Sequence, residues 1–224
     1  MEQLLVYIVF FLIVFFINCM GLRLYKKEQK RKFGLVLFLF SFALLLMFIG
    51  FRYNVGTDYE SYLITYNRIK ILSFNELYKY DWEFGAVLLF KLVSLFFKNN
   101  FILFFFIGAF QLYPIYKINK LNKFEFLPYS VLIFCFVFLP FYLNGMRQGI
   151  AISFALLSFY YLHDKNNNIK SILYLTLGYM FHKSILIIIP YLILSLISNK
   201  KRYKKLSIII TIIISIIIYS FLKK

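Results

Sequence analysis

The chain has 224 residues, of which 62% are hydrophobic and 22% aromatic, with a mean hydropathy of +0.77. This apolar share excludes a soluble globular domain. The formal net charge is +17, but the basic residues stand in short clusters between apolar runs, so we expect no nucleic-acid partner. The composition predicts an integral membrane protein surrounded by the lipid bilayer.

The apolar runs predict the fold class. In lipid each backbone amide must be satisfied internally, and the runs lack the alternation of barrel strands, so we expect an all-α, polytopic helix bundle. It forms one transmembrane domain over residues 1–224. We expect eight spans, at about 3–22, 34–51, 101–116, 127–143, 148–162, 171–181, 185–199 and 206–222.

The basic clusters orient this bundle. They occupy residues 23–32, 117–123, 165–170 and 200–205, as is typical of cytoplasmic loops. The N-terminus is then outside, together with an external functional loop at 52–84. The first apolar run has no basic residue before it and six Lys or Arg residues after it, which predicts an uncleaved anchor and not a signal peptide.

Whether residues 85–97 cross the membrane decides on which side all the later loops lie. The stretch is short for a span and carries Lys91 in its middle. We expect a re-entrant or half-buried helix that opens to the outer side. A tilted full span with a snorkelling Lys91 remains the alternative.

A polar strip from Arg52 to Tyr59 follows the second predicted span. Five of the nine acidic residues lie between positions 58 and 83. Gly56 permits a tight backbone, Thr57 and Asp58 offer oxygen acceptors, and Tyr59 supplies a ring. The alternative for Arg52 is an interfacial cation that snorkels at a helix end.

A second polar break contains Arg147 and Gln148. Gly145 and Gly149 flank them and let a backbone or a ligand approach closely. Arg147 falls in the first turn of the next predicted helix, where a cation is unfavourable for the helix dipole alone. The arrangement becomes favourable when an anion binds there, so we expect a phosphate or diphosphate guest.

His182 and Glu83 are the remaining candidates for chemistry. An imidazole can act as base, acid or phosphate ligand near neutral pH, although a histidine at a membrane interface is often only a polar tip among headgroups. Glu83 precedes Gly85 at the mouth of the partial helix, and its alternative is a surface carboxylate. We predict that the strip, Arg147 and His182 face one side of the membrane and build one site.

Ordered short motifs then resemble a known family. The strip with Tyr62, the Glu83-Phe-Gly85 step, the Met-Arg-Gln-Gly-Ile-Ala151 break and Met180-Phe-His-Lys-Ser184 occur in the order seen in the EpsG family, which is related to Wzy-type polymerases. The resemblance implies a bacterial plasma-membrane polymerase. It joins polyprenyl-diphosphate-linked oligosaccharide repeats into exopolysaccharide or capsule at the outer face, with other assembly proteins as partners.

The resemblance also implies roles for these residues. Arg147 and Arg52 would stabilise the leaving diphosphate, and Asp58, Glu83 or His182 would orient or deprotonate the acceptor hydroxyl. We favour His182 as base or diphosphate ligand and Asp58 as the acceptor-positioning group. Gly56, Thr57, Tyr59 and Gln148 would line the substrate site. We expect no metal, because two histidines on opposite sides make no ligand cluster, and no cofactor.

Three alternatives remain open. A transporter or flippase of the same lipid-linked sugar would also bind a diphosphate, but it would need a polar route across the bilayer. A ligase that hands finished polymer to another acceptor uses nearly the same parts. A non-catalytic partner, or a short or truncated copy of a polymerase, is the third.

Overall fold

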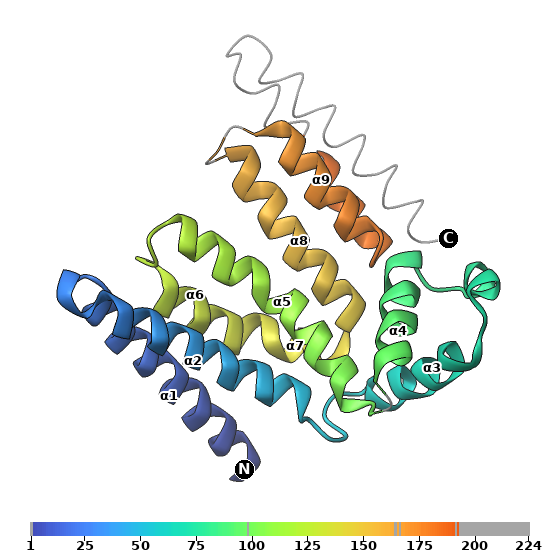
Figure 1. The fold of residues 1–224 in the computed structure, drawn as a ribbon, viewed down its shortest axis with the longest axis horizontal. Helices are drawn as coiled ribbons and strands as arrows, with labels where there is room; N and C mark the ends of the chain where they lie inside the picture. Colours follow the sequence, from blue (N-terminus) through green and yellow to red (C-terminus); the bar gives the residue numbers. More distant parts are fainter. Residues whose placement is uncertain (1, 98, 164, 166, 191, 193–224) are drawn as a thin grey trace.

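The computed structural model describes residues 2–97, 99–163, 165, 167–190 and 192, and this part of the chain contains helices and no strands (Figure 1). Helix α1 (Glu2–Tyr25) and helix α2 (Arg31–Gly50) form a hairpin, joined through the 3-10 turn η1 (Glu28–Lys30). A polar pair inside this hairpin, Ser41 Oγ and Asn18 Oδ1 at 3.0 Å, fixes how the two apolar helices face each other.

Helix α5 (Phe101–Leu121) lies between α2 and α8 (Met146–His163) (Figure 1). A run packed against α1 consists of α6 (Leu127–Ile133), the π-helical turn η3 (Phe134–Phe138) and α7 (Leu139–Asn144). Pro140 lacks the N–H that an α-helix would offer to the carbonyl four residues earlier, which accounts for the irregular turn just before it.

Helix α8 pairs with α9 (Asn168–Tyr179), which leads into the 3-10 segment η4 (Lys183–Ile188). Two apolar cores result. One joins α1 and α2 to α6 and α7, and the other joins α3, α4, α5 and α8. The second core ends beside the polar residues discussed below, so it is the core that positions the site.

The predicted external loop at 52–84 is largely helical. It contains α3 (Tyr59–Ile71) and η2 (Phe74–Lys79), and it leads into α4 (Phe84–Phe96). Lys91 in α4 is buried, and its Nζ donates to the carbonyl oxygens of Lys70 (3.1 Å) and Leu72 (2.6 Å) at the end of α3. The amine therefore ties α4 to the end of α3, and whether α4 crosses the membrane fully stays open.

Four helical segments among the described residues are long and apolar enough to cross a membrane: Leu5–Tyr25, Glu28–Gly50, Phe101–Leu121 and Leu127–Asn144. The chain is thus an all-helical, multi-pass membrane protein. The predicted short helix at 85–97 is present as α4, an apolar helix of 13 residues. The predicted spans at 148–162 and 171–181 are present as helices α8 and α9 but are not among these four. The predicted spans at 185–199 and 206–222 fall largely or wholly outside the described residues, so the count of eight stays a prediction.

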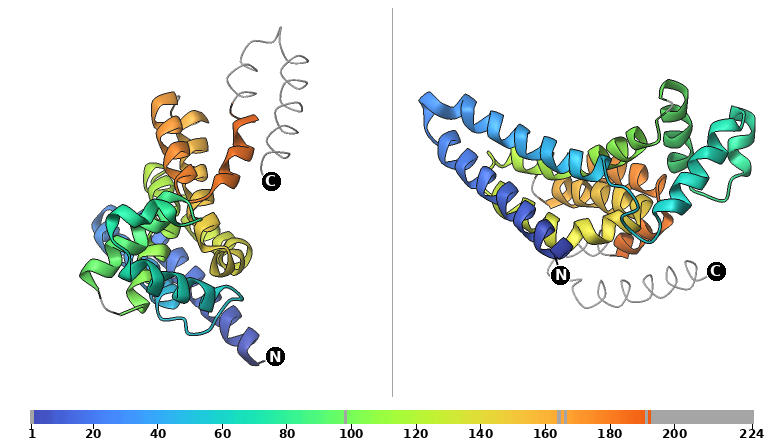
Figure 2. Two further views of the ribbon diagram at one scale, coloured as in Figure 1. Left: turned by 90° about the vertical axis from the view of Figure 1, so that its right-hand side faces the viewer. Right: turned by 90° about the horizontal axis from the view of Figure 1, so that it is seen from below.

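The polar strip and the basic clusters at 23–32 and 117–123 lie at opposite ends of this bundle, whereas the cluster at 200–205 falls outside the described residues. At one end, Arg52 bonds to the carbonyl of Leu143 at the end of α7. At the other end, the rings of Tyr25 and Phe124 lie 5.3 Å apart and Tyr160 reaches Asn122. The hairpin α1–α2 and the pair α3–α4 stand on opposite sides of the molecule (Figure 2). The structure thereby separates two ends of the bundle, and which of them faces outward stays a prediction from the positive charges.

Candidate functional site

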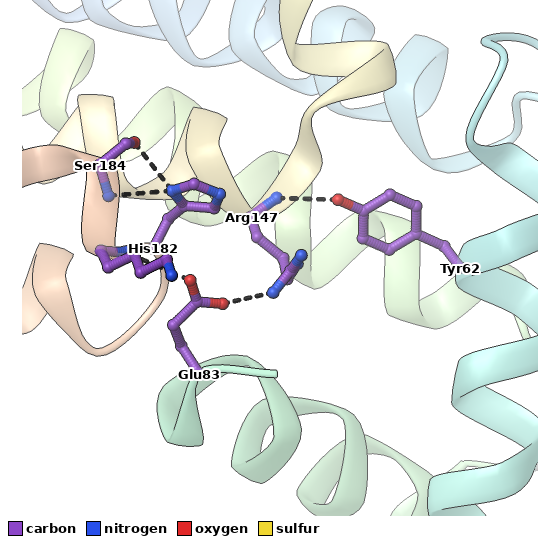
Figure 3. Close-up of polar contacts among 6 residues, drawn as sticks. Tyr62, Glu83, Arg147, His182 and Ser184 are labelled. Carbon is purple, nitrogen blue, oxygen red and sulfur yellow. Dashed lines mark hydrogen bonds and ion pairs between the residues drawn. The ribbon is translucent and has the colours of Figure 1, made fainter. Parts of the chain in front are cut away.

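An ion pair between Glu83 and Arg147 forms the centre of the site (Figure 3). Arg147 is the second residue of α8, as its predicted place in a first helical turn requires. Glu83 is the N-cap residue of α4, but its carboxylate makes no capping bond to that helix and turns to Arg147 instead. Both side chains remain about one-fifth exposed, at 21% for Arg147 and 19% for Glu83, so a ligand can reach the pair.

Two aromatic residues hold Arg147 in place. The guanidinium carbon lies 4.1 Å from the ring centroid of Trp82, a cation–π contact that fixes the guanidinium plane. The backbone N–H of Arg147 donates to the phenolic oxygen of Tyr62 (3.3 Å), a buried residue of α3. Arg147 Nε is buried and has no hydrogen-bond partner among the described residues. The guanidinium therefore keeps one N–H donor without a partner among the described residues, as Arg52 does at its own Nε.

The start of α4 docks directly on the segment after α9. The backbone N–H of Gly85 donates to the carbonyl oxygen of Met180 (2.8 Å), which satisfies an amide that the first turn of a helix leaves free. The backbone N–H of Lys183 donates to Glu83 Oε1 (3.2 Å). Glu83 therefore bridges Arg147 and the His182–Ser184 segment.

Local bonds set the tautomer of His182. The backbone N–H of Ser184 donates to Nδ1 (3.1 Å), and the Ser184 hydroxyl lies 2.8 Å from the same nitrogen. A backbone N–H can only donate, so Nδ1 carries no proton and the neutral ring bears its proton on Nε2. His182 is thereby prepared as a hydrogen-bond donor through Nε2.

The charge state of His182 agrees with that role. Burial lowers the pKa of His182 below its usual 6.5; the Glu83 carboxylate raises it, and Arg147 and Lys183 lower it. The net direction is downward, so the imidazole is neutral at pH 7. The three charges acting on this ring also indicate that His182 shares one electrostatic environment with the ion pair.

Arg52 is placed differently from Arg147. It is 6% exposed, its Nη1 donates to the Leu143 carbonyl oxygen (2.7 Å), and its guanidinium carbon lies 4.7 Å from the ring centroid of Phe104. Burial lowers the pKa of Arg52 to about 10, so it stays charged at neutral pH. The cation sits at the carbonyl end of α7, where the helix dipole favours it. It fixes the turn that precedes Arg147.

Gly56 and Thr57 contact the same turn. Gly56 has a positive φ of 97°, and a Cβ there would lie 2.8 Å from the Leu143 carbonyl oxygen. The backbone N–H of Thr57 donates to Asn144 Oδ1 (2.7 Å). Asp58 follows as the exposed N-cap residue of α3 and accepts from the Thr57 hydroxyl at 3.3 Å. These residues connect the polar strip to α7 and make no direct bond to Arg147.

Tyr59 and Gln148 also differ in their surroundings. Tyr59 is buried, and its ring stacks on Phe104 with centroids 5.0 Å apart, so it serves the core of α3 and α5. Gln148 is half-buried and its side chain makes no hydrogen bond to the described residues. At Gly149 a Cβ would meet Gln111 and Tyr142 at 2.8–2.9 Å, whereas Gly145 has ordinary space around it.

The structure thus brings together Glu83, Arg147 and His182 from segments that lie far apart in the sequence. Sequence reasoning named Tyr62 only within the strip motif, and it predicted no contact of Tyr62 or Trp82 with Arg147. Trp82 is the chain's single tryptophan and stands next to Glu83 in the sequence. This position beside a candidate carboxylate could have indicated that Trp82 belongs to the site. Among the described residues, no three His, Cys, Asp or Glu side chains gather where they could hold a metal ion.

These features define a multi-pass helical membrane protein with a cation, a carboxylate and an imidazole gathered at one end of the bundle. The EpsG family model matches residues 35–224. The chain therefore belongs to the EpsG family, as its motifs indicated. No curated protein and no solved structure matches the chain.

Proposed function

We propose that this protein is a polysaccharide polymerase of the bacterial plasma membrane. It transfers a growing chain from its polyprenyl diphosphate to a sugar hydroxyl of the next lipid-linked repeat unit at the outer face. The observation that carries the proposal is the half-buried Glu83–Arg147 pair at the start of α8, beside the neutral His182. Membership of the EpsG family supports it.

Arg147 is the group that binds the leaving diphosphate. Its guanidinium is oriented by Trp82, it keeps an unpaired Nε–H, and it stands at the N-terminal end of an 18-residue helix. Helix amides and a guanidinium converging on one point favour an anion there. The site is partly excluded from water, which strengthens the attraction as charge develops on the diphosphate.

Glu83 is the base for the acceptor hydroxyl. Without substrate its Oε2 pairs with Arg147. When the diphosphate takes over the guanidinium, the carboxylate loses its cationic partner and can accept a hydrogen bond from the acceptor hydroxyl instead. Binding of the donor thus prepares the base, while the bond from Lys183 N–H to Oε1 keeps the carboxylate in position.

The reaction is a displacement at the anomeric carbon of the donor chain. The acceptor oxygen forms the new bond to this carbon as the bond between the carbon and the diphosphate oxygen breaks. The electron pair leaves with the diphosphate, and the hydroxyl proton passes to Glu83. His182 donates from Nε2 to a departing phosphate oxygen, and Asp58 positions the acceptor sugar at the start of α3.

Polymer size in cells tests the proposal. Arg147→Ala and Arg147→Lys should both leave single repeat units on the lipid carrier, because a point charge does not reproduce the planar fork of a guanidinium. Arg68→Ala removes an exposed arginine of α3 and should leave the ladder intact. Membrane levels are measured for all variants. A normal ladder with Arg147→Ala would remove the leaving-group role and with it the polymerase assignment.

A further inference from the structure

A large apolar cavity begins directly beside the polar site. It has a volume of about 690 Å³ and is lined by residues of α4, α5, α8 and α9 and of the segment after α9. This volume lies in the range of small-molecule pockets in proteins. Its walls are leucine, phenylalanine, tyrosine and other side chains, and the surface that they present to the cavity is almost entirely apolar.

The cavity lining includes chain neighbours of the Glu83–Arg147–His182 cluster. Gly85, Met180 and Phe181 belong to its lining. Gly85 lies two residues after Glu83, and Phe181 immediately precedes His182. The hydrogen bond from Gly85 to Met180 joins the two sides of the cavity at the point where the polar site begins. The cationic site and the apolar chamber therefore lie next to each other at the Gly85–Met180 contact.

We propose that this cavity holds the first isoprene units of the polyprenyl diphosphate substrate. The inference rests on the proposed function and adds where the lipid chain lies. A polyprenyl diphosphate carries a diphosphate at one end and a branched hydrocarbon chain at the other. The diphosphate matches the positive charge of Arg147, and the hydrocarbon matches the apolar walls of the cavity. Burial of the hydrocarbon against phenylalanine and leucine side chains adds to the affinity that the diphosphate gains from Arg147.

Cavity binding also serves the chemistry. A chain held between α4 and α9 fixes the diphosphate at the start of α8, so that the anomeric carbon is oriented when the acceptor arrives. It also distinguishes the carrier from a free sugar nucleotide, which has a diphosphate but no hydrocarbon chain. The substrate is thereby selected by its lipid, independently of the sugars that it carries.

Photo-cross-linking tests the inference on the full chain in phosphatidylcholine nanodiscs. The probe is a farnesyl diphosphate that carries a diazirine on its hydrocarbon chain. We expect adducts on wall residues of α4, α5 and α9, and competition by unlabelled farnesyl diphosphate. Ala109 is an exposed small residue of the lining, so Ala109→Trp fills the chamber without overpacking the core. It should reduce these adducts about tenfold.

The matched control is Val36→Trp, which places the same side chain on the exposed face of α2, where Val36 is 60% exposed. It should leave the adducts unchanged. Adducts that avoid the wall in the wild type, or that remain in Ala109→Trp, would overturn the inference. So would adducts displaced by added phospholipid and not by farnesyl diphosphate, since acyl chains would then be the occupants. If Ala109→Trp fails to insert, the wild-type adduct map alone decides.

The two proposals can fail separately. Wall adducts in a protein whose Arg147→Ala variant makes a normal ladder would keep the lipid site and remove the polymerase role. Adducts elsewhere, with a ladder that depends on Arg147, would keep the polymerase and remove the cavity inference. Absence of any adduct would mean that other groups fill the chamber, including chain outside the described residues, and would also overturn it.

Discussion

Gly85 and Met180 meet backbone to backbone at the entrance of the site. The Gly85 N–H donates to the Met180 carbonyl oxygen at 2.8 Å, and a Cβ on Gly85 would lie 2.6 Å from that same oxygen. A backbone atom cannot swing away as a side-chain tip can. The contact therefore sets how close α4 comes to the His182 segment, and with it the distance over which Glu83 can bridge them.

The first prediction follows from this approach. Gly85→Ala should push the start of α4 away from Met180, lower the stability of the protein by about 1–3 kcal/mol and suppress polymer formation. Gly145→Ala is the matched control, because its Cβ would meet its nearest neighbour at an ordinary 3.5 Å. Thermal unfolding and polymer ladders measure both effects. Equal behaviour of the two variants would contradict the close-approach argument.

The second prediction concerns the charge on Glu83. Glu83→Gln keeps an oxygen for the Lys183 N–H but removes the base and the negative partner of Arg147. We expect tighter binding of an isoprenyl diphosphate, because nothing anionic competes for the guanidinium, together with loss of polymer. The control is Glu60→Gln, at an exposed position of α3. Weaker diphosphate binding in Glu83→Gln would show that the carboxylate does not compete with the ligand.

Much of this arrangement follows from local sequence. The apolar runs and basic clusters predict the helices and the two ends of the bundle, because lipid leaves the backbone few choices. Helix α3 was not predicted, although the sequence contains a helical pattern there. Its buried residues Tyr59, Tyr62, Tyr66 and Ile69 recur at helical spacing. The interpretation of residues 52–84 as an external loop left that period out of account.

Pairings across the chain were beyond prediction from one sequence. Arg52 and Arg147 both follow apolar runs and both adjoin glycines, yet Arg52 is buried against Leu143, 91 residues away, while Arg147 faces Glu83. The contacts of Tyr62 in α3 and of Glu83 before α4 with the start of α8 determine which arginine stays within reach of a ligand. The sequence indicated that both lie at one end, but the difference in their surroundings is tertiary.

The third prediction separates those two arginines. Arg52→Ala should lower the free energy of unfolding by about 1–3 kcal/mol, because the Leu143 carbonyl loses its partner. The protein that remains folded should bind an isoprenyl diphosphate normally, unlike Arg147→Ala. Binding per folded molecule is measured beside thermal stability, with Arg68→Ala as the control. Lost affinity at unchanged stability would instead make Arg52 a substrate ligand.

The fourth prediction is a pH dependence of stability. Because the folded pKa of His182 lies below 6.5, the unfolded chain binds this proton first as the pH falls. The neutral His182 ring contributes fully to the free energy of unfolding above pH 6.5. This contribution is lost as the pH falls through the pKa of His182 in the folded protein. Protonation of Nδ1 would also set an N–H against the Ser184 N–H. Thermal stability of the wild type relative to His182→Gln should therefore decline on acidification. A constant difference would mean that burial does not hold this ring neutral.

The fifth prediction tests the role of His182 in the reaction. A glutamine amide can donate a hydrogen bond but cannot accept a proton as an imidazole does. If Nε2–H donates to the departing phosphate, His182→Gln should retain part of the chain growth that His182→Ala loses. Ladder length and the turnover of lipid-linked repeats are compared at equal membrane levels, with His163→Gln, an exposed histidine at the end of α8, as the control. Complete loss in both His182 variants, with normal folding, would instead assign His182 as the base and leave Glu83 as its electrostatic partner.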